Sequence, residues 1–141
     1  MRRWLATSVV ALAACLAMGA NVASATPASG ISAVNIGDTT FWGTTRILTQ
    51  VITFQPGATS GWHGHGGVTQ VMIISGTGTF YSPDCTSQQQ PTGSFFIEQP
   101  GENHLLRNET TEPLVVVARY ILPLGAPPRI DRPAPAGCAV A

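Results

Sequence analysis

Three histidines are the only ones in the chain, and their spacing could place them around one metal ion. His63 and His65 form a His-x-His pair, and His104 follows in a later segment. Imidazole is the commonest side-chain metal ligand, and three rings can hold a divalent ion while leaving positions open for water or substrate. Imidazole nitrogen suits iron, nickel, copper and zinc better than magnesium or calcium. The sequence predicts a divalent transition-metal site, with Fe, Zn, Ni and Cu left open.

Each histidine also has an ordinary structural interpretation. His63 and His65 stand among several glycines and could be exposed turn residues. His104 could be a hydrogen-bonded core residue. These alternatives remain open from residue type alone.

A metal site of this kind needs strands to carry it, because residues i and i+2 of a strand point to the same face. Residues 46–54 alternate with the period of a strand, and 70–75 and 114–122 are apolar, β-branched runs typical of strands buried on both faces or nearly so. Shorter strands are predicted at 77–81, 94–97 and 104–107. Gly and Pro turns separate these runs, and no segment is convincingly helical. The pattern indicates an all-β sandwich or barrel.

Length and charge narrow the function classes. A chain of 141 residues with 44% hydrophobic and 10% charged residues supports one domain with a buried core. Its basic residues are all Arg, they balance the acidic residues in number, and they do not cluster. The basic surface expected of a nucleic-acid-binding protein is therefore missing.

The N-terminus has the pattern of a signal peptide. Arg2 and Arg3 precede an apolar run over 5–18, and Ala23-Ser24-Ala25 provides small residues for cleavage after Ala25. The run is shorter than the roughly 20 residues that span a bilayer. We expect a secreted or periplasmic mature protein without a membrane segment. The alternative is a lipoprotein anchored at Cys15, which ends a lipobox-like stretch.

Removal of the leader leaves Cys85 and Cys138 as the only cysteines. In an oxidising compartment two cysteines predict one disulfide, which here would tie a Pro-rich C-terminal tail to the body. Closing such a loop is worth about 4 kcal/mol in the chain-entropy model. Two unpaired surface thiols are the alternative.

Two motifs together resemble the cupin superfamily. The pattern G(X)5HXH(X)3-4E(X)6G runs from Gly57 to Gly76 through His63 and His65, without its glutamate. The pattern G(X)5PXG(X)2H(X)3N runs from Gly93 to Asn108 through His104, with its proline displaced by one position. The resemblance covers about 47–122.

The resemblance implies a small, single-domain jelly-roll β-barrel with the three histidines around a metal. We divide the chain into a signal peptide at 1–25, an N-terminal arm or strand at 26–45, the barrel at 46–124 and an irregular Pro-rich tail at 125–141. Pairing of barrels in the family allows a homodimer. The expected binding partner of this chain is a small-molecule ligand or substrate.

The chain departs from the family at the glutamate of the first motif, where it has Thr69 or Gln70. Either residue could act in a second shell around the metal, or simply line the barrel. Glu102 could be a substitute acid or outer-shell partner, although a solvated turn residue is the simpler interpretation. A site without a carboxylate would favour an anionic or chelating ligand.

Several other residues have structural or incidental interpretations. Asn108-Glu109-Thr110 reads as a glycosylation sequon, but Asn108 also ends the second motif. Large apolar residues are assigned to core or pocket wall: Trp62, Met72, Ile74, Phe80, Phe95 and Tyr120.

Three function classes remain. The first is a secreted metalloenzyme of the dioxygenase or isomerase type, the second is a non-catalytic module that binds a small molecule or metal, and the third is a degenerate, metal-free scaffold. An acid or base within reach of the ion would favour the enzyme, and a smooth apolar wall would favour the binding module.

Overall fold

The computed structural model describes residues 24–140, and this part of the chain is built from strands without a helix. The strands, in chain order, are β1 (Ser29–Phe41), β2 (Thr45–Thr59), β3 (His63–Gly64), β4 (Val68–Ser75), β5 (Thr77–Tyr81), β6 (Ser87–Pro91), β7 (Phe95–Glu98), β8 (Leu105–Arg107), β9 (Leu114–Pro123) and β10 (Ile130–Asp131). The predicted all-β fold is confirmed.

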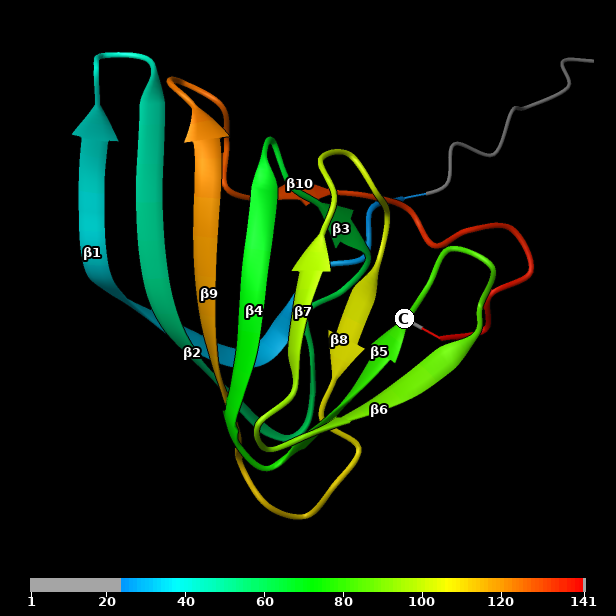
Figure 1. Cartoon of the computed structure of the whole chain (residues 1–141). Helices are drawn as coiled ribbons and strands as arrows, with labels where there is room; N and C mark the ends of the chain where they lie inside the picture. Colours follow the sequence, from blue (N-terminus) through cyan, green and yellow to red (C-terminus); the bar gives the residue numbers. More distant parts are fainter. Residues whose placement is uncertain (1–23, 141) are drawn as a thin grey trace, which may run out of the picture.

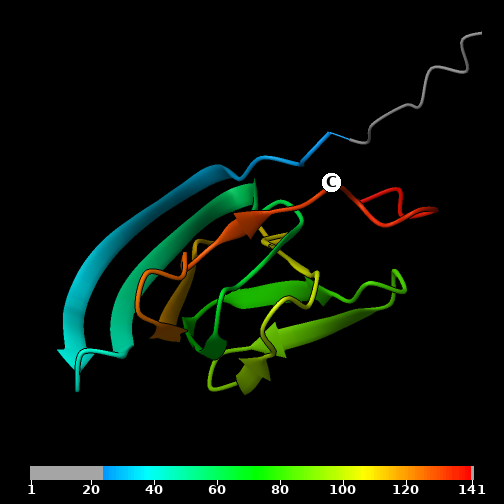
Figure 2. The ribbon, with the colours of Figure 1, turned by 90° about the horizontal axis from the view of Figure 1, so that it is seen from above.

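One sheet dominates the molecule. Its strands follow the order β6-β5-β8-β2-β9-β4-β7, and β1 also pairs with β2. Strand β2 joins the two halves of this sheet, because Thr45 to Phe54 pair with β9 and Thr59 pairs with Arg107 of β8. The sheet curls into the half-barrel of a jelly roll, with β1 and β2 arching over the remaining strands (Figures 1 and 2).

Strand alternation places the core inside this curl. In β9, Leu114, Val116, Ala118, Tyr120 and Leu122 are buried, and the residues between them are partly or fully exposed. The expectation that 70–75 and 114–122 are buried on both faces is therefore wrong, because nothing in the described chain covers the outer face.

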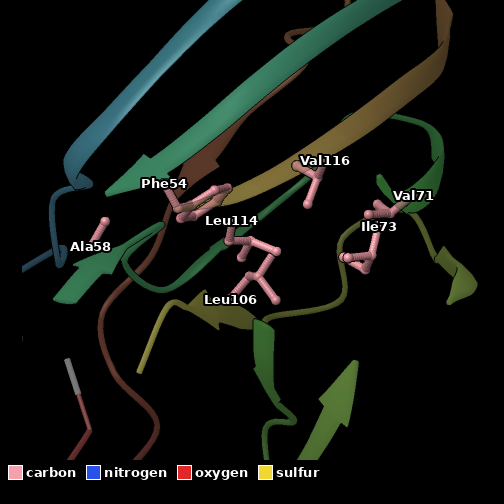
Figure 3. Packing of buried hydrophobic residues seen from close by; sticks show 7 residues of the cluster. All are labelled: Phe54, Ala58, Val71, Ile73, Leu106, Leu114 and Val116. Carbon is pink, nitrogen blue, oxygen red and sulfur yellow. The ribbon is translucent and has the colours of Figure 1, made fainter. Parts of the chain in front are cut away.

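The buried side chains form two clusters. One lies between β2, β4, β8 and β9 and is shown in Figure 3: Phe54, Ala58, Val71, Ile73, Leu106, Leu114 and Val116. The other consists of Leu48, Ala118, Tyr120 and Leu122.

Three of the residues assigned to core or pocket wall lie on the outer face instead. Met72, Ile74 and Phe95 are 45%, 46% and 55% exposed. They alternate along β4 and β7 with residues that point inward. Because successive side chains of a strand point to opposite faces, the neighbours of an inward residue point to solvent. Cross-strand pairing joins this surface into an apolar row across five strands: Val34, Val51, Val117, Met72 and Phe95. No observation on this outer face tests the predicted homodimer, which stays a prediction.

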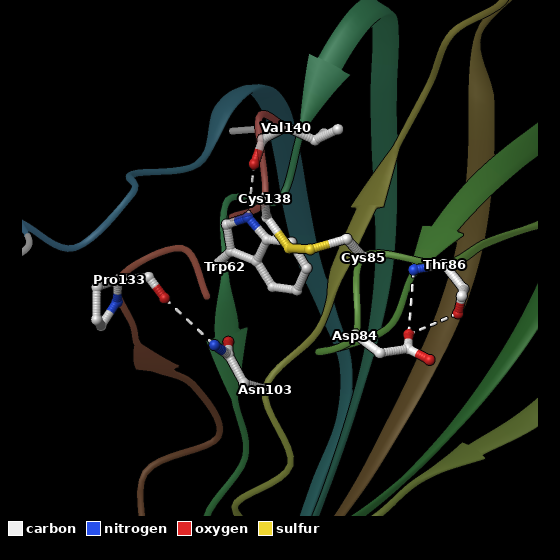
Figure 4. Close-up of a disulfide and its surroundings, with 8 residues drawn as sticks. All are labelled: Trp62, Asp84, Cys85, Thr86, Asn103, Pro133, Cys138 and Val140. Atoms are coloured by element: carbon white, nitrogen blue, oxygen red, sulfur yellow. Dashed lines mark hydrogen bonds between the residues drawn. A yellow bond between two sulfur atoms is a disulfide. The ribbon is translucent and has the colours of Figure 1, made fainter. Parts of the chain in front are cut away.

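The N-terminal arm and the C-terminal tail pack on the barrel. Most of 26–45 is β1, which is hydrogen-bonded along β2. The tail, expected to be irregular, contains β10, which pairs with β3. Cys85 and Cys138 lie at disulfide distance with their Cα atoms 5.5 Å apart, and the buried Trp62 donates its indole N–H to the Val140 carbonyl (Figure 4).

The leader and the glycosylation sequon differ in whether the structure describes them. The signal-peptide body and Cys15 lie outside the described residues. Asn108 of the sequon is fully buried and donates to the carbonyls of Phe54 and Glu112, so its side chain is inaccessible in the folded protein. Residues 24–140 contain no helix with the length and hydrophobicity needed to traverse a bilayer.

Truncation of one core residue tests the inward face. We expect Leu114→Ala, at a fully buried position, to lower the free energy of unfolding by about 3 kcal/mol, because it leaves a cavity. Met72→Ala on the outer face is the matched control and should cost less than about 1 kcal/mol. Urea denaturation of both variants measures the difference, and equal losses would contradict the assignment of faces.

Candidate metal centre

Backbone pairing brings the three histidines together. His63 and His104 exchange both backbone hydrogen bonds, each 2.9 Å long, as an antiparallel bridge. On its other side, His63 pairs with Asp131 of β10. The segment His63 to His65 therefore lies between the second-motif segment and the C-terminal tail.

The glycines around the His-x-His pair permit this close packing. A Cβ atom on Gly64 would lie 2.9 Å from the Glu102 carbonyl oxygen, and one on Gly66 would lie 2.7 Å from the Pro127 carbonyl oxygen. Both distances are shorter than van der Waals contact. The glycine-rich sequence serves close backbone approach, and the exposed-turn interpretation of His63 and His65 is wrong.

The three imidazoles are buried and face one point. His63, His65 and His104 are 7%, 3% and 1% exposed, and one ligand nitrogen from each lies within 4.8 Å of the others. The Nε2 atoms of His65 and His104 are 3.1 Å apart. Phe80 stacks on the His104 ring with centroids 5.5 Å apart, which fixes the plane of that ring.

Carbonyl groups set the tautomers of two rings. His63 Nδ1 lies 2.8 Å from the Gly61 carbonyl oxygen, and His65 Nδ1 lies 2.6 Å from that of Pro128. A carbonyl oxygen only accepts, so each Nδ1 carries the proton and donates it. In the neutral rings, Nε2 is left with its lone pair directed away from these carbonyls, as a metal ligand requires.

Glu98 is the site residue that sequence reasoning missed. Its carboxylate oxygens lie 2.9 Å from His65 Nε2 and 3.3 Å from His104 Nε2, and the residue is 6% exposed. Glu98 ends β7 and pairs with Thr69 of β4, so the two side chains share a face. The carboxylate absent from Thr69 is supplied by the neighbouring strand.

A signal for Glu98 was present in the sequence. It directly follows the predicted strand 94–97 and is two residues after Phe96, which packs against the core. Continuing the strand by one residue would have placed its carboxylate on the inner face.

Thr69, Gln70 and Glu102, which the sequence offered as residues that could support the metal ligands, differ in their positions. Thr69 is fully buried, and its hydroxyl has no hydrogen-bond partner within residues 24–140. Gln70 lies on the outer face of β4, between two inward residues, and so cannot support the site. Glu102 is exposed and makes no ion pair with the histidines in the described chain, so it is not the substitute acid.

Burial favours the neutral forms of His63 and His104. Loss of hydration, reinforced by the positive charges that His104 and Arg129 can carry, lowers the pKa of His63 to about 2. Burial also lowers the pKa of His104, against the opposing effect of the Glu98 charge. Neutral imidazoles near pH 7 are available to bind a cation.

A cavity of about 280 Å³ opens onto the site. Its polar lining includes His63, His65, Glu98, Tyr120 and Arg129, and the other walls are mainly aliphatic. Burial raises the pKa of Tyr120 well above its usual range, so its hydroxyl stays protonated and can donate a hydrogen bond.

The donor set fits a metal ion. Two ligands bound at right angles to one ion at about 2.0 to 2.1 Å stand about 3 Å apart. The distances among Glu98, His65 and His104 are 2.9, 3.1 and 3.3 Å. Nitrogen and carboxylate ligands in this arrangement suit iron, zinc, nickel or copper.

Comparisons with known proteins agree with this architecture. The sequence model of a family described as "Cupin domain" matches residues 50–120. The polyketide cyclase RemF from Streptomyces resistomycificus has a TM-score of 0.62 at 16% identity, over 78% of this chain and 80% of that one. A cupin-like protein from Thermotoga maritima has a TM-score of 0.62 at 17% identity, over 76% and 86%. A cupin domain from Bordetella pertussis has a TM-score of 0.52 at 21% identity, over 68% and 95%.

No curated protein matches the sequence. At these identities, the likeness to solved structures shows the fold alone.

The lowered histidine pKa values predict acid sensitivity of the metal-free protein. His63 binds a proton in the unfolded chain below about pH 6.5 but not in the folded site, so protonation favours unfolding. The free energy of unfolding should fall by up to about 1.4 kcal/mol per pH unit for each such ring as pH drops below 6.5. Urea denaturation of chelator-treated protein between pH 7 and pH 4 measures this slope. His63→Gln should flatten it, and an unchanged slope would contradict the assignment.

Proposed function

The chain belongs to the cupin superfamily, and on that basis we propose that it is a metal-dependent enzyme acting on a small, mostly apolar molecule. His63, His65, His104 and Glu98 hold a divalent transition metal at the base of the cavity. Bound there, the ion supplies Lewis-acid polarisation and binding positions for a substrate. The chemistry is of the dioxygenase or isomerase type.

The convergence of lone pairs carries this proposal. The proton of His65 is committed to the Pro128 carbonyl, so its Nε2 presents a lone pair to a Glu98 oxygen 2.9 Å away. A second Nε2, that of His104, lies 3.1 Å from the first. Acceptor atoms at such distances need a cation among them, either a proton shared between two of them or a metal ion. A metal ion meets that requirement for all the ligands at once.

Glu98 also changes the balance between enzyme and binding module. Its carboxylate completes a nitrogen and oxygen ligand set for the ion, which the first motif alone lacks. Tyr120 can donate its hydroxyl to an oxygen atom of a molecule in the cavity. The aliphatic walls exclude water from the reacting groups. These walls also suit non-catalytic binding of a small molecule, which is the second candidate function.

Removal of the carboxylate tests the metal site. We expect the wild-type protein to purify with one equivalent of iron, zinc, nickel or copper, measured by elemental analysis. Glu98→Gln should weaken metal affinity by about 100-fold or more, because loss of an outer-shell partner alone costs 10- to 100-fold. His65→Ala should lose the ion entirely.

A relocated carboxylate provides the control. Thr69→Glu combined with Glu98→Thr moves the acid to the paired position on β4 and should restore much of the affinity lost in Glu98→Gln. Wild-type protein that stays metal-free in excess iron, zinc, nickel and copper would overturn both the enzyme and any metal-dependent binding module, in favour of a metal-free scaffold.

We further propose that the mature protein is exported. The leader pattern at 1–25 and the cysteine pair at disulfide distance support this assignment. Thr26, the first residue after the predicted cleavage site, is already anchored: its N–H donates to the Arg132 carbonyl, and its hydroxyl accepts from Trp62 N–H.

Sequencing of the mature N-terminus tests export. We expect protein recovered from the periplasm or culture medium to begin at Thr26 and to contain no free thiol. A lipid-modified N-terminus at Cys15 would support the lipoprotein alternative, and an uncleaved leader in a cytoplasmic product would contradict export.

A further inference from the structure

We infer that Arg129 makes the cavity selective for small organic acids, by binding a carboxylate while the apolar body of the ligand fills the cavity. This inference extends the proposed function by naming the ligand class. It gives a role to a residue of the C-terminal tail, a segment expected from sequence to be irregular and remote from the site.

The tail places Arg129 between contacts to two of the metal-site histidines. The residue before it, Pro128, accepts the hydrogen bond of His65 Nδ1. Asp131, two residues after it, pairs with His63 across the β10–β3 ladder. Arg129 itself lines the cavity. Its backbone position is therefore fixed by the same contacts that orient the ligands.

The guanidinium is held on two sides and keeps donors for a ligand. Nη2 donates to the Ser60 carbonyl at 2.5 Å, and Nε donates to Asp131 Oδ1 at 2.7 Å. A guanidinium has five N–H groups, and these two bonds use two of them. In the described chain no further acceptor is bonded to this group. A planar, pre-positioned fork of this kind suits a carboxylate.

The charges around the cavity also favour an anion. Asp131, the partner of Arg129, has a side chain 53% exposed and is not among the cavity-lining residues. Glu98 is the acidic residue of the lining, and its oxygens lie on the histidine side of the cavity, 2.9 Å from His65 Nε2 and 3.3 Å from His104 Nε2. The positive charge of Arg129 reaches the interior, where it helps to lower the pKa of His63.

The remaining walls define the ligand body. Ile52, Phe54, Val116 and Ala118 contribute apolar surface, and the volume of about 280 Å³ is at the small end of ligand-binding pockets. A compact ring or short branched chain with one carboxylate combines the required size, apolar surface and charge.

Binding of matched acids and amides tests the inference. The probes are benzoate, phenylacetate and cyclohexanecarboxylate with their primary amides, titrated by calorimetry into the mature protein in zinc-loaded and chelator-treated forms. We expect at least one acid to bind about tenfold or more tightly than its amide. Arg129→Gln should remove that preference in the chelator-treated form and reduce it in the zinc-loaded form, with amide binding unchanged.

Two further variants separate recognition from folding and from general charge. Arg129→Lys keeps the charge and should retain part of the preference. Arg119→Gln removes the same charge from an exposed position on β9 and should leave it intact. Thermal unfolding checks that each variant is folded.

An acid preference unchanged in Arg129→Gln, an equal loss in Arg119→Gln, or no measurable binding of any acid would overturn the inference. Metal content is measured separately. A metal-free protein that still prefers acids through Arg129 would therefore reject the proposed function and retain this one.

Discussion

The structure depends on a buried cluster of three imidazoles and one carboxylate that converge on one point. Glu98 and the Nε2 atoms of His65 and His104 converge inside an apolar half-barrel, where an uncompensated carboxylate would be costly. The surrounding architecture holds them there regardless. Carbonyl groups fix the imidazole tautomers, Phe80 stacks on His104, and backbone bridges join the segments that carry the rings. Such preorganisation is what distinguishes a ligand-binding site from a chance cluster of polar residues.

The carboxylate of the site stands on the strand that neighbours the one where the cupin motif has its glutamate. Thr69 and Glu98 are cross-strand partners on one face, so either position can direct an acid at the same point. A motif read along one strand cannot represent this equivalence, since the partner lies on another strand far along the sequence. The paired surface of β4 and β7 supplies the carboxylate, so the missing glutamate of the first motif does not leave the three histidines without an acidic neighbour.

Sequence alone was sufficient for the fold class, for most strands and for the three histidines. Period-two alternation located β2, and apolar, β-branched runs located β4 and β9, whereas the polar strand β6 (SQQQP) has neither signal and was missed. Met72 and Phe95 were assigned to the core or pocket wall, but residue type alone does not show which face of a strand a side chain occupies. Glu98 and Arg129 were missed for a related reason: their proximity to the histidines arises from strand pairing and from the path of the tail, which only tertiary structure determines.

The contact between Pro128 and His65 has a consequence for the order of events during biogenesis. The acceptor that orients this ring lies near the end of the chain, and β10 can join β3 only after the barrel segments have been synthesised. A nascent polypeptide without its tail therefore lacks the acceptor that orients the His65 ring. If the site holds the metal proposed above, the compartment in which folding ends determines which ions compete for the protein.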